Sequence, residues 1–494
     1  MAVLSVDAGT TGVTAMIVAE DGSVLARDTQ EFTQHFPDNG WVEHAPEDIW
    51  AATLTATREA IGATDEPVTA VGITNQRETV VFWDRETLGA PRRAIVWQDR
   101  RTARRCDELR DEGREPRVSE LTGLRLDPYF SASKIEWVRR NDERTWAGVS
   151  SGRVALGTVD SYLVARMTRG LHHVTDASNA SRTLLFDLHT GRWSPELCEL
   201  FGVPVDALPE IVSSYGPVAT TDPASFLGLR LPISGIAGDQ QAALFGQTAF
   251  SAGDSKCTYG TGSFVLSNTG HTPVTGSARL LATVAWRAPD GTDTFALEGS
   301  VFVTGSAVQW LRDGLQLIDD AREVEALARS VPDSGGVVFV PALAGLGAPH
   351  WDPFARGLIV GITRGTTRAH LARATLDGIV FCVRDVVDAM VDEGGLHLAG
   401  LAVDGGAAAN DLLCQLQADQ LGVEVRRPRV VETTGLGAAF LAGLGSGVWA
   451  STDELRQTWQ LDRAFAPGAR DDRDYARWCR AVDRARDWAA DEPD

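Results

Sequence analysis

The sequence contains very little lysine. Only Lys134 and Lys256 occur among the 494 residues, so nearly all of the positive charge is arginine. No GxxxxGK[ST] string is present, which excludes a Walker-type nucleotide site. A V-A-I-K strand is also absent, which excludes the ATP-binding lysine of the protein kinases. Any nucleotide bound by this chain must therefore be held by other groups.

Long apolar runs and paired cysteines are also missing. No run reaches 18 apolar residues, so we expect no insertion into a membrane. The six cysteines contain no CxxC pair, a pattern typical of reduced thiols rather than of disulfides or a zinc site. The opening MAVLSVD lacks the basic region of a signal peptide, and we expect a cytoplasmic protein.

Acidic residues outnumber basic ones and give a formal net charge of −21 and a pI near 4.9. A surface of this sign repels polyanions, which argues against nucleic acid and anionic membranes as partners. Hydrophobic residues make up 44% and charged residues 23% of the chain, as in ordinary globular enzymes. A length of 494 residues exceeds what one core usually serves, so we expect two large domains.

Apolar strands and helices alternate along the chain. VLSVD, TAMIVAE and SVLARDTQEF are predicted strands, and Asp21-Gly22 between the last two is a strong hairpin signal. Pro46 opens a predicted helix, and VTAVGIT, TVVFW and AIVWQ follow as strands. Strands interleaved with helices predict an α/β fold with binding groups at the strand ends.

The opening pattern of the chain occurs a second time. DAGTTGVTA, from Asp7 to Ala15, is a strand end, a Gly/Thr turn and a new strand, and KCTYGTGSFVLSN repeats this order from Lys256 to Asn268. The small-residue stretch GQTAFSAGD lies between the repeats, so we predict domains at 1–247 and 248–494. A core helix is predicted at 369–390, and the Arg/Asp-rich residues after about 450 are predicted to form a helical appendage.

The glycine turns suit phosphate groups. Glycine lets backbone N–H groups approach an anion closely, and threonine adds hydroxyl donors. Asp7, at the end of its strand, can hold hydrated magnesium beside the phosphates. A third turn, Asp404-Gly405-Gly406, precedes a predicted helix and suits a nucleotide. Each turn alone is more often structural, but the three together predict phosphate binding.

Four polar strings stand outside the structural pattern: GITNQRETVVFW, AIVWQDRRT, LDPYFSASKIEW and ISGIAGDQQAALFGQ. Together with GWVEHAPEDIW, YGTGSF, ALEGS, GLGAPHWDPFARG and VDGGAAAND, they resemble the FGGY family of carbohydrate kinases from about residue 3 to 465. The resemblance implies an α/β protein of two RNase H-like domains, of the actin-like ATPase superfamily, with an interdomain cleft for nucleotide and substrate. It also implies a homo-oligomer, a dimer or a tetramer.

The resemblance further implies that the chain phosphorylates glycerol to sn-glycerol 3-phosphate with ATP and Mg²⁺. The positions that match the glycerol site of the family are Arg77, Glu78, Trp97, Tyr129, Asp239, Gln240 and Phe264. Carboxylates and a guanidinium suit a polyol because its hydroxyls both donate and accept. Asp239 is the expected catalytic residue, a general base that takes the proton of the attacking hydroxyl. The metal position is Asp7, and the nucleotide positions are Thr10, Thr11, Gly12, Thr261, Gly305, Gln309, Gly406 and Asn410.

Other interpretations stay open at this point. The substrate could be another short polyol or a ketose, and the chain could be a regulator that binds nucleotide or polyol without catalysis. Arg77 and Glu78 could form a surface ion pair, Trp97 could belong to the core, and Asp239 could only cap a helix. Two departures from the family bear on activity. Ala8 replaces a larger residue, and Thr14 stands where a lysine or arginine normally faces the phosphates.

Overall fold

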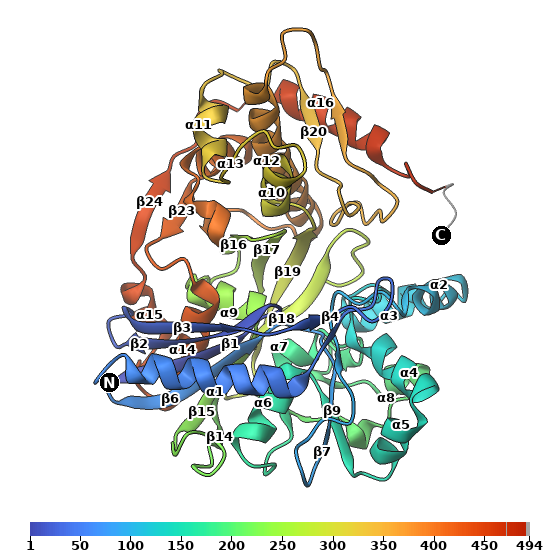
Figure 1. Cartoon of the computed structure of the whole chain (residues 1–494), viewed down its shortest axis with the longest axis vertical. Coiled ribbons are helices and arrows are strands. Elements are labelled where there is room, and N and C mark those ends of the chain that lie inside the picture. The colour runs from blue at the N-terminus through green and yellow to red at the C-terminus, as the bar shows by residue number, and fades with distance from the viewer. Residues whose placement is uncertain (471, 491–494) are drawn as a thin grey trace.

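The computed structural model describes residues 1–470 and 472–490 and contains two large sheets, each with helices packed against it (Figure 1). The strand order of the first sheet is β14-β15-β6-β1-β2-β3. β1 is antiparallel to β2 and parallel to β6, and β15 is also parallel to β6. The bounds of these strands are β1 Ala2–Ala8, β2 Gly12–Ala19, β3 Val24–Glu31, β6 Val68–Asn75, β14 Tyr215–Thr220 and β15 Pro232–Gly238.

The second sheet repeats the plan of the first. Its order is β18-β19-β17-β16-β22-β23-β24. The antiparallel strands β19, β17 and β16 correspond to β3, β2 and β1, and the parallel pair β22 and β23 corresponds to β6 and β15. This order confirms the predicted α/β class with two RNase H-like units. The bounds are β16 Ser255–Tyr259, β17 Ser263–Gly270, β18 Leu281–Arg287, β19 Asp293–Val301, β22 Leu401–Asp404, β23 Val425–Pro428 and β24 Leu461–Phe465.

The helix that Pro46 was expected to open is α1, Pro46–Gly62, which packs on β2 and β3. The rest of the first unit holds short helices and strands: α2 Ala103–Asp111, α3 Glu115–Thr122, α4 Ser131–Asn141, α5 Glu143–Ser150, α6 Val159–Met167, α7 Ala177–Ala180, α8 Pro195–Phe201, η1 Val205–Ala207, β4 Gln34–His35, β5 Glu43–His44, β7 Val81–Asp84, β8 Ala94–Ile95, β9 Val154–Gly157, β10 Val174–Asp176, β11 Phe186–Asp187, β12 Arg192–Trp193 and β13 Glu210–Val212. The expected strands TVVFW and AIVWQ correspond to β7 and β8, but β7 pairs with β9 and β8 with β5, outside the first sheet. The chain leaves the first sheet after β6, through the turn at residues 76–79.

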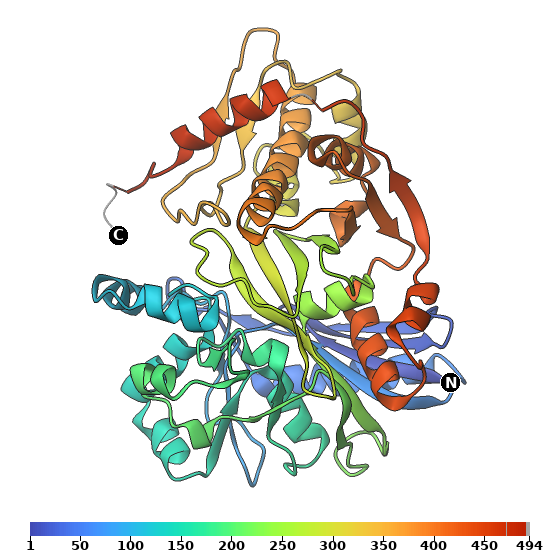
Figure 2. The same cartoon turned by 180° about the vertical axis from the view of Figure 1, so that it is seen from behind.

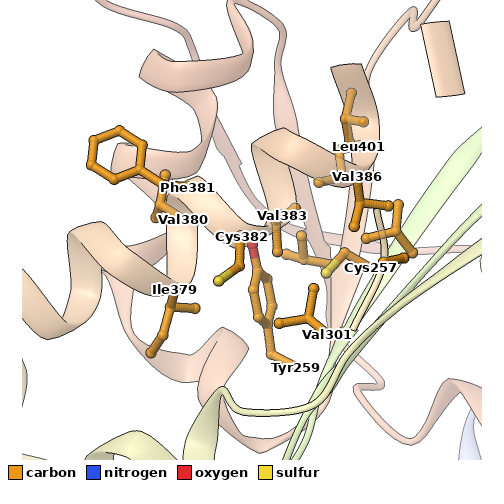
Figure 3. Close-up of a cluster of buried hydrophobic side chains, with 14 of the residues drawn as sticks. Cys257, Tyr259, Val301, Ile379, Val380, Phe381, Cys382, Val383, Val386 and Leu401 are labelled. Atoms are coloured by element: carbon orange, nitrogen blue, oxygen red, sulfur yellow. The ribbon is translucent and has the colours of Figure 1, made fainter. Parts of the chain in front are cut away.

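The second unit is built around the long helix α12, Arg368–Gly394, which confirms the core helix predicted at 369–390. Figure 3 shows its Val383 and Val386 beside Cys257 and Tyr259 of β16 in an apolar cluster. Among the residues that the structure describes, no helix is both long and apolar enough to cross a membrane. The other elements are α9 Asp239–Gly246, α10 Gly305–Asp313, α11 Glu323–Arg329, α13 Asp411–Leu421, α14 Thr433–Ser446, α15 Thr452–Thr458, α16 Asp472–Ala485, η2 Gly406–Ala409, β20 Val338–Val340 and β21 Leu358–Val360.

The residues after 450 are not only helical, and in this the prediction is wrong. Strand β24 lies between α15 and α16 and pairs with β23 at the edge of the second sheet. Its sequence LDRAF has weak strand propensity, but charges join it to its neighbours. Arg427 of β23 pairs with Asp462, and Arg463 pairs with Asp411. These ion pairs, one to β23 and one to the start of α13 (Asp411–Leu421), favour a strand where the local composition indicated a helix.

Helix α14 lies in the chain between β23 and β24 of the second sheet but packs on the first sheet and on α9. Figure 2 shows this orange-red helix beside the blue N-terminal strands. Glycines make the close packing possible. A Cβ added to Gly437 would lie 1.8 Å from the carbonyl oxygen of Ala242 in α9, and one added to Gly72 of β6 would lie 2.1 Å from that of Ala438. The boundary predicted at residue 247 falls between α9 and β16. Helix α14 comes after this boundary in the chain but packs against elements that come before it.

We expect Gly437→Ala to destabilise the protein, although alanine favours a helix over glycine. The added methyl group would force α14 and α9 apart, and overpacking of this kind costs about 1–3 kcal/mol. Urea denaturation followed by circular dichroism measures the change. Gly62→Ala in the last turn of α1 is the matched control, because no atom lies within 4 Å of its added Cβ. Equal stability of the Gly437 variant and the wild type would contradict the close helix crossing.

Candidate active site

The turn after β6 carries two charged side chains into the interior. Glu78 has a φ of 63°, a left-handed conformation that non-glycine residues rarely adopt. The backbone N–H of Thr79 donates to the carbonyl of Arg77 at 2.8 Å, which closes this tight turn. The exposed fraction of the side chain is 2% for Arg77 and 1% for Glu78, so the alternative of a surface ion pair is wrong. Strained residues of this kind concentrate at functional sites.

The guanidinium of Arg77 contacts groups from both units. Its Nε lies 3.1 Å from Oδ1 of Asp239, at the start of α9. Its Nη1 and Nη2 donate to the two carboxylate oxygens of Glu298 in β19, at 2.5 and 3.1 Å. Nη2 also donates to the hydroxyl of Tyr129 at 3.2 Å. A paired fork of this type fixes both the position and the orientation of the cation.

A second buried arginine extends this arrangement. Arg182 donates through Nη2 to Glu298 at 3.0 Å and through Nε to Glu78 at 2.8 Å, and its side chain is fully buried. Burial raises the pKa of Glu298, but the guanidiniums of Arg182 and Arg77 outweigh burial and lower it to about 2. Glu298 is therefore ionised at any physiological pH. We call Asp239, Arg77, Glu298, Arg182 and Glu78 the charge chain.

Asp239 is the member of the charge chain that a ligand can reach. Its side chain is 29% exposed, whereas that of Glu298 is 0% exposed. The N-cap of α9 is Gly238 and not Asp239, so capping alone does not account for this carboxylate. A Cβ added to Gly238 would lie 2.7 Å from the side-chain carbons of Arg77, so only glycine leaves room for the arginine stem. The adjacent Gln240 accepts a hydrogen bond from Lys256 at its side-chain oxygen.

Aromatic side chains form one wall beside these charges. The rings of Trp97 and Tyr129 lie 5.4 Å apart, and the ring of Phe264 in β17 lies 5.9 Å from the guanidinium carbon of Arg77. Trp97 is only half-buried, and its Nε1 donates to the hydroxyl of Thr10 at 2.9 Å. This bond joins the aromatic wall to the first glycine turn. An apolar wall beside fixed charges suits a small molecule with both carbon and hydroxyl groups.

Each sheet presents a glycine turn at the corresponding hairpin. The first, between β1 and β2, contains Thr10 and Thr11 and is fixed by Gln76, which donates to the carbonyl of Gly9 at 2.9 Å. The second, between β16 and β17, contains Thr261 and touches the start of α10. There the N–H of Gly305 donates to the carbonyl of Gly260 at 3.0 Å. Thr11 and Thr261 are both exposed, as a phosphate contact requires.

The third glycine turn lies next to the second. Thr258 of β16 pairs with Asp404 of β22, so the two turns that follow these strands share one edge of the sheet. Gly405 has a φ of 82°, and a Cβ there would lie 2.5 Å from the carbonyl oxygen of Tyr259. Gly406 begins η2, and Asn410 caps α13 by accepting from the N–H of Leu413 at 2.9 Å.

Asp7 provides a group that fits a bound cation. Its carboxyl group makes no hydrogen bond to another described residue, and burial together with the nearby Asp239 raises its pKa to about 7. Two close carboxylates without a cation repel each other, and a divalent ion relieves that repulsion. No group of three or more His, Cys, Asp or Glu side chains is gathered for a metal within the described ranges. A magnesium ion at Asp7 would therefore take most of its ligands from other oxygens, such as those of water and phosphate.

The structure thus brings Arg77, Glu78, Trp97, Tyr129, Asp239 and Phe264 into one connected group by the contacts given above. Gln309 lies exposed on α10, one turn after Gly305, with no contact that joins it to this group. Thr14, the position of the missing cation, lies on β2 and shares a hydrogen bond with Thr29 of β3 at 2.9 Å. The sequence patterns assigned no role to Glu298, Arg182 or Lys256, although the strings ALEGS and KCTYGTGSFVLSN contain Glu298 and Lys256.

Residues 2–246 match the N-terminal domain of the FGGY family of carbohydrate kinases, and residues 255–446 match its C-terminal domain. The chain therefore belongs to the FGGY family of carbohydrate kinases. A glycerol kinase from Myxococcus xanthus is 52% identical over 490 residues, which cover 98% of this chain and 99% of that protein. A glycerol kinase from Dechloromonas aromatica is also 52% identical, over 99% of this chain and 98% of that protein.

Solved structures agree with this membership. Glycerol kinase from Plasmodium falciparum with ADP has a TM-score of 0.92 and 34% sequence identity, and the match covers 98% of each chain. A ligand-bound xylulose kinase from Lactobacillus acidophilus has a TM-score of 0.86 at 20% identity, over 99% of each chain. At that identity the second likeness shows the fold alone.

We expect Glu298→Gln to destabilise the protein strongly. The variant leaves Arg77 and Arg182 facing each other with one carboxylate fewer, and removing one partner of a buried pair costs about 3–5 kcal/mol. Thermal unfolding measures the loss. Glu196→Gln is the control, because Glu196 also pairs with an arginine, Arg117, but both side chains are more than half exposed, at 53% and 51%. Similar melting temperatures for the two variants would contradict the buried pairing of an ionised Glu298 with the two guanidiniums.

Proposed function

We propose that this protein transfers the terminal phosphoryl group of ATP to glycerol and forms sn-glycerol 3-phosphate. The observation that carries the proposal is the pair of Arg77 and Asp239, at 3.1 Å, beside a half-exposed aromatic wall. The pair offers a hydroxyl of a short polyol a carboxylate that is within reach and that the buried cation holds in place. The identity of the polyol is supported by the relatives that are 52% identical and are named glycerol kinases.

Asp239 is the proposed general base. One carboxylate oxygen of Asp239 is held by Arg77, so the other is free to accept the proton of the attacking hydroxyl. Arg77 keeps the carboxylate in place because it is itself fixed by Glu298. Tyr129, Trp97 and Phe264 would pack against the carbon chain and exclude water from the reacting oxygen. The protein's part in phosphoryl transfer is then mainly positioning and electrostatics.

The three glycine turns are proposed to hold ATP. Thr10, Thr11 and Gly12 would bind phosphate oxygens from the first unit, and Thr261 would do so from the second. Gly305, Gln309, Gly406 and Asn410 are proposed to complete the nucleotide site. Asp7 would hold Mg²⁺, which neutralises phosphate charge when it is bound. The cytoplasmic location and the homo-oligomeric state, a dimer or tetramer, stay predictions.

We expect Asp239→Asn to lower turnover about 10²- to 10⁴-fold, because an amide cannot accept the hydroxyl proton as a base. A coupled assay of ADP release, run over glycerol, dihydroxyacetone, erythritol and xylulose, measures this and the substrate preference together. Asp290→Asn is the control: this exposed residue lies in the β18–β19 turn, and its replacement leaves turnover unchanged. Glycerol turnover by the wild type no higher than by Asp239→Asn would contradict the proposal.

Asp7→Asn is expected to stabilise the free protein at pH 8. A carboxyl group with a pKa near 7 in the folded state and about 3.9 unfolded costs stability as pH rises from about 4 to 7, here up to about 4 kcal/mol. The variant removes this cost, so its advantage over the wild type grows from pH 5 to pH 8. Thermal unfolding across this range measures the difference.

The same unfolding experiment tests the metal. We expect Mg²⁺ with ADP to raise the melting temperature of the wild type more than that of Asp7→Asn, because the variant lacks the carboxylate that is proposed to hold the cation. An equal rise in both proteins would place the cation elsewhere. An advantage of the variant that did not depend on pH would contradict the raised pKa.

A further inference from the structure

The two lysines of the chain are both fully buried. Lys134 and Lys256 each have an exposed fraction of 0%. Lysine is almost never fully buried unless its ammonium group is paired or hydrogen-bonded. A compact ammonium group with three donors fits places that a planar guanidinium cannot, so two buried lysines in an arginine-rich chain mark such places. Lys134 donates to backbone carbonyls, among them that of Tyr129 at 2.8 Å, whereas Lys256 donates to a side chain of the polyol site.

The face of β16 on which Lys256 lies is the polar one. Side chains alternate between the two faces of a strand, and Figure 3 shows Cys257 and Tyr259 in the apolar cluster on one face. Lys256 and Thr258 lie on the other face, toward α9. There Lys256 Nζ donates to Gln240 Oε1 at 2.5 Å and to Thr258 Oγ1 at 2.8 Å. Lys256 therefore reaches from the second sheet to a residue next to the proposed base.

This contact decides how the amide of Gln240 is oriented. An ammonium group can only donate, so the side-chain oxygen of Gln240 must face it and the NH₂ group must point away. That NH₂ group makes no hydrogen bond to another residue in the described part of the chain. Gln240 is also only 7% exposed, so little water competes with Lys256 for its side-chain oxygen. Lys256 thus sets the orientation of the Gln240 amide, and the NH₂ group of Gln240 is left to donate to a ligand.

We propose that Lys256 is a positioning residue for polyol binding, which holds the Gln240 amide with its NH₂ group toward the substrate hydroxyl. The proposal rests on the function proposed above. A hydroxyl at this place can donate to Asp239 and accept from Gln240 at the same time. Without Lys256 the amide can present its oxygen instead, and two acceptors would then face a hydroxyl that has one proton.

The charge of Lys256 is compatible with this role. Burial lowers its pKa, and the carboxylates of Asp404, Asp239 and Glu298 oppose that effect. Asp404 is itself held by Gln247, which donates to it at 2.8 Å. The cation therefore lies among acidic groups, and its two hydrogen bonds go to Gln240 and Thr258.

The test is a double-mutant cycle of Lys256→Met and Gln240→Ala, read as the KM for glycerol. We expect Lys256→Met to raise KM roughly 10- to 100-fold in the wild-type background, the loss of a charge-fixed hydrogen bond. In the Gln240→Ala background it should change KM less than about 2-fold, because residues that act through one contact are not additive. The same fold increase in both backgrounds would overturn the proposal.

Tyr259→Phe is the matched control on the opposite face of the same strand. It removes the buried hydrogen bond to Gln417 at 2.7 Å, so it should lower the melting temperature but leave the glycerol KM unchanged. A KM increase as large as that of Lys256→Met would mean that any disturbance of β16 has this effect, and would overturn the proposal. If Lys256→Met does not fold, Lys256→Gln replaces it in the cycle. The glutamine side chain of Lys256→Gln can both donate and accept, so we expect a smaller increase in KM than for Lys256→Met. In the Gln240→Ala background we again expect no increase.

The cycle separates failure of this proposal from failure of the proposed function. A wild-type protein that does not phosphorylate glycerol would contradict the function, and the cycle would then use the polyol that the substrate panel shows to be phosphorylated. An active wild type with additive effects would contradict only the role of Lys256.

Discussion

A guanidinium that is buried at the junction of the two units is the constraint on which the site depends. Arg77 cannot be deprotonated in a protein, so its charge must be met by carboxylates wherever it lies. Asp239 at the start of α9 meets it from the first unit, and Glu298 in β19 meets it from the second. The two RNase H-like units are therefore joined at the same charge that forms the pocket.

The need to neutralise Arg77 explains the alternation of the charge chain. Glu298 lies between two guanidiniums, and Arg182 donates hydrogen bonds to both Glu298 and Glu78. Replacing a buried ion pair with well-packed apolar groups often leaves stability unchanged. Net stabilisation therefore does not explain why the protein has the charge chain. The charge chain is better explained by the fixed positions that it gives to its charged groups. Each group in it is held from two directions, and only Asp239 keeps an oxygen that a ligand can reach.

The local parts of the structure were predictable from the sequence, and the long-range parts were not. The first hairpin, α1, α12 and the glycine turns follow from alternation, proline and glycine signals. Arg77 and Asp239 were predicted through long family motifs. Glu298 was missed because a single glutamate in an apolar strand has no spacing signal, and its partner Arg77 lies 221 residues away. Strand β24 was missed for the same reason, since ion pairs to β23 and α13 fix it.

On the proposed function, selectivity for a hydroxylated substrate follows from how the pocket fixes its donors and acceptors. Each group that faces the ligand is oriented by a partner behind it: Asp239 by Arg77, and Gln240 by Lys256. A site whose polar groups cannot turn toward one another leaves them unpaired when a ligand lacks the matching hydroxyl, and the loss of affinity is then large. A deoxy analogue would leave both the acceptor and the donor without partners. On this proposal, residues that do not touch the substrate contribute to its recognition by fixing the side chains that do.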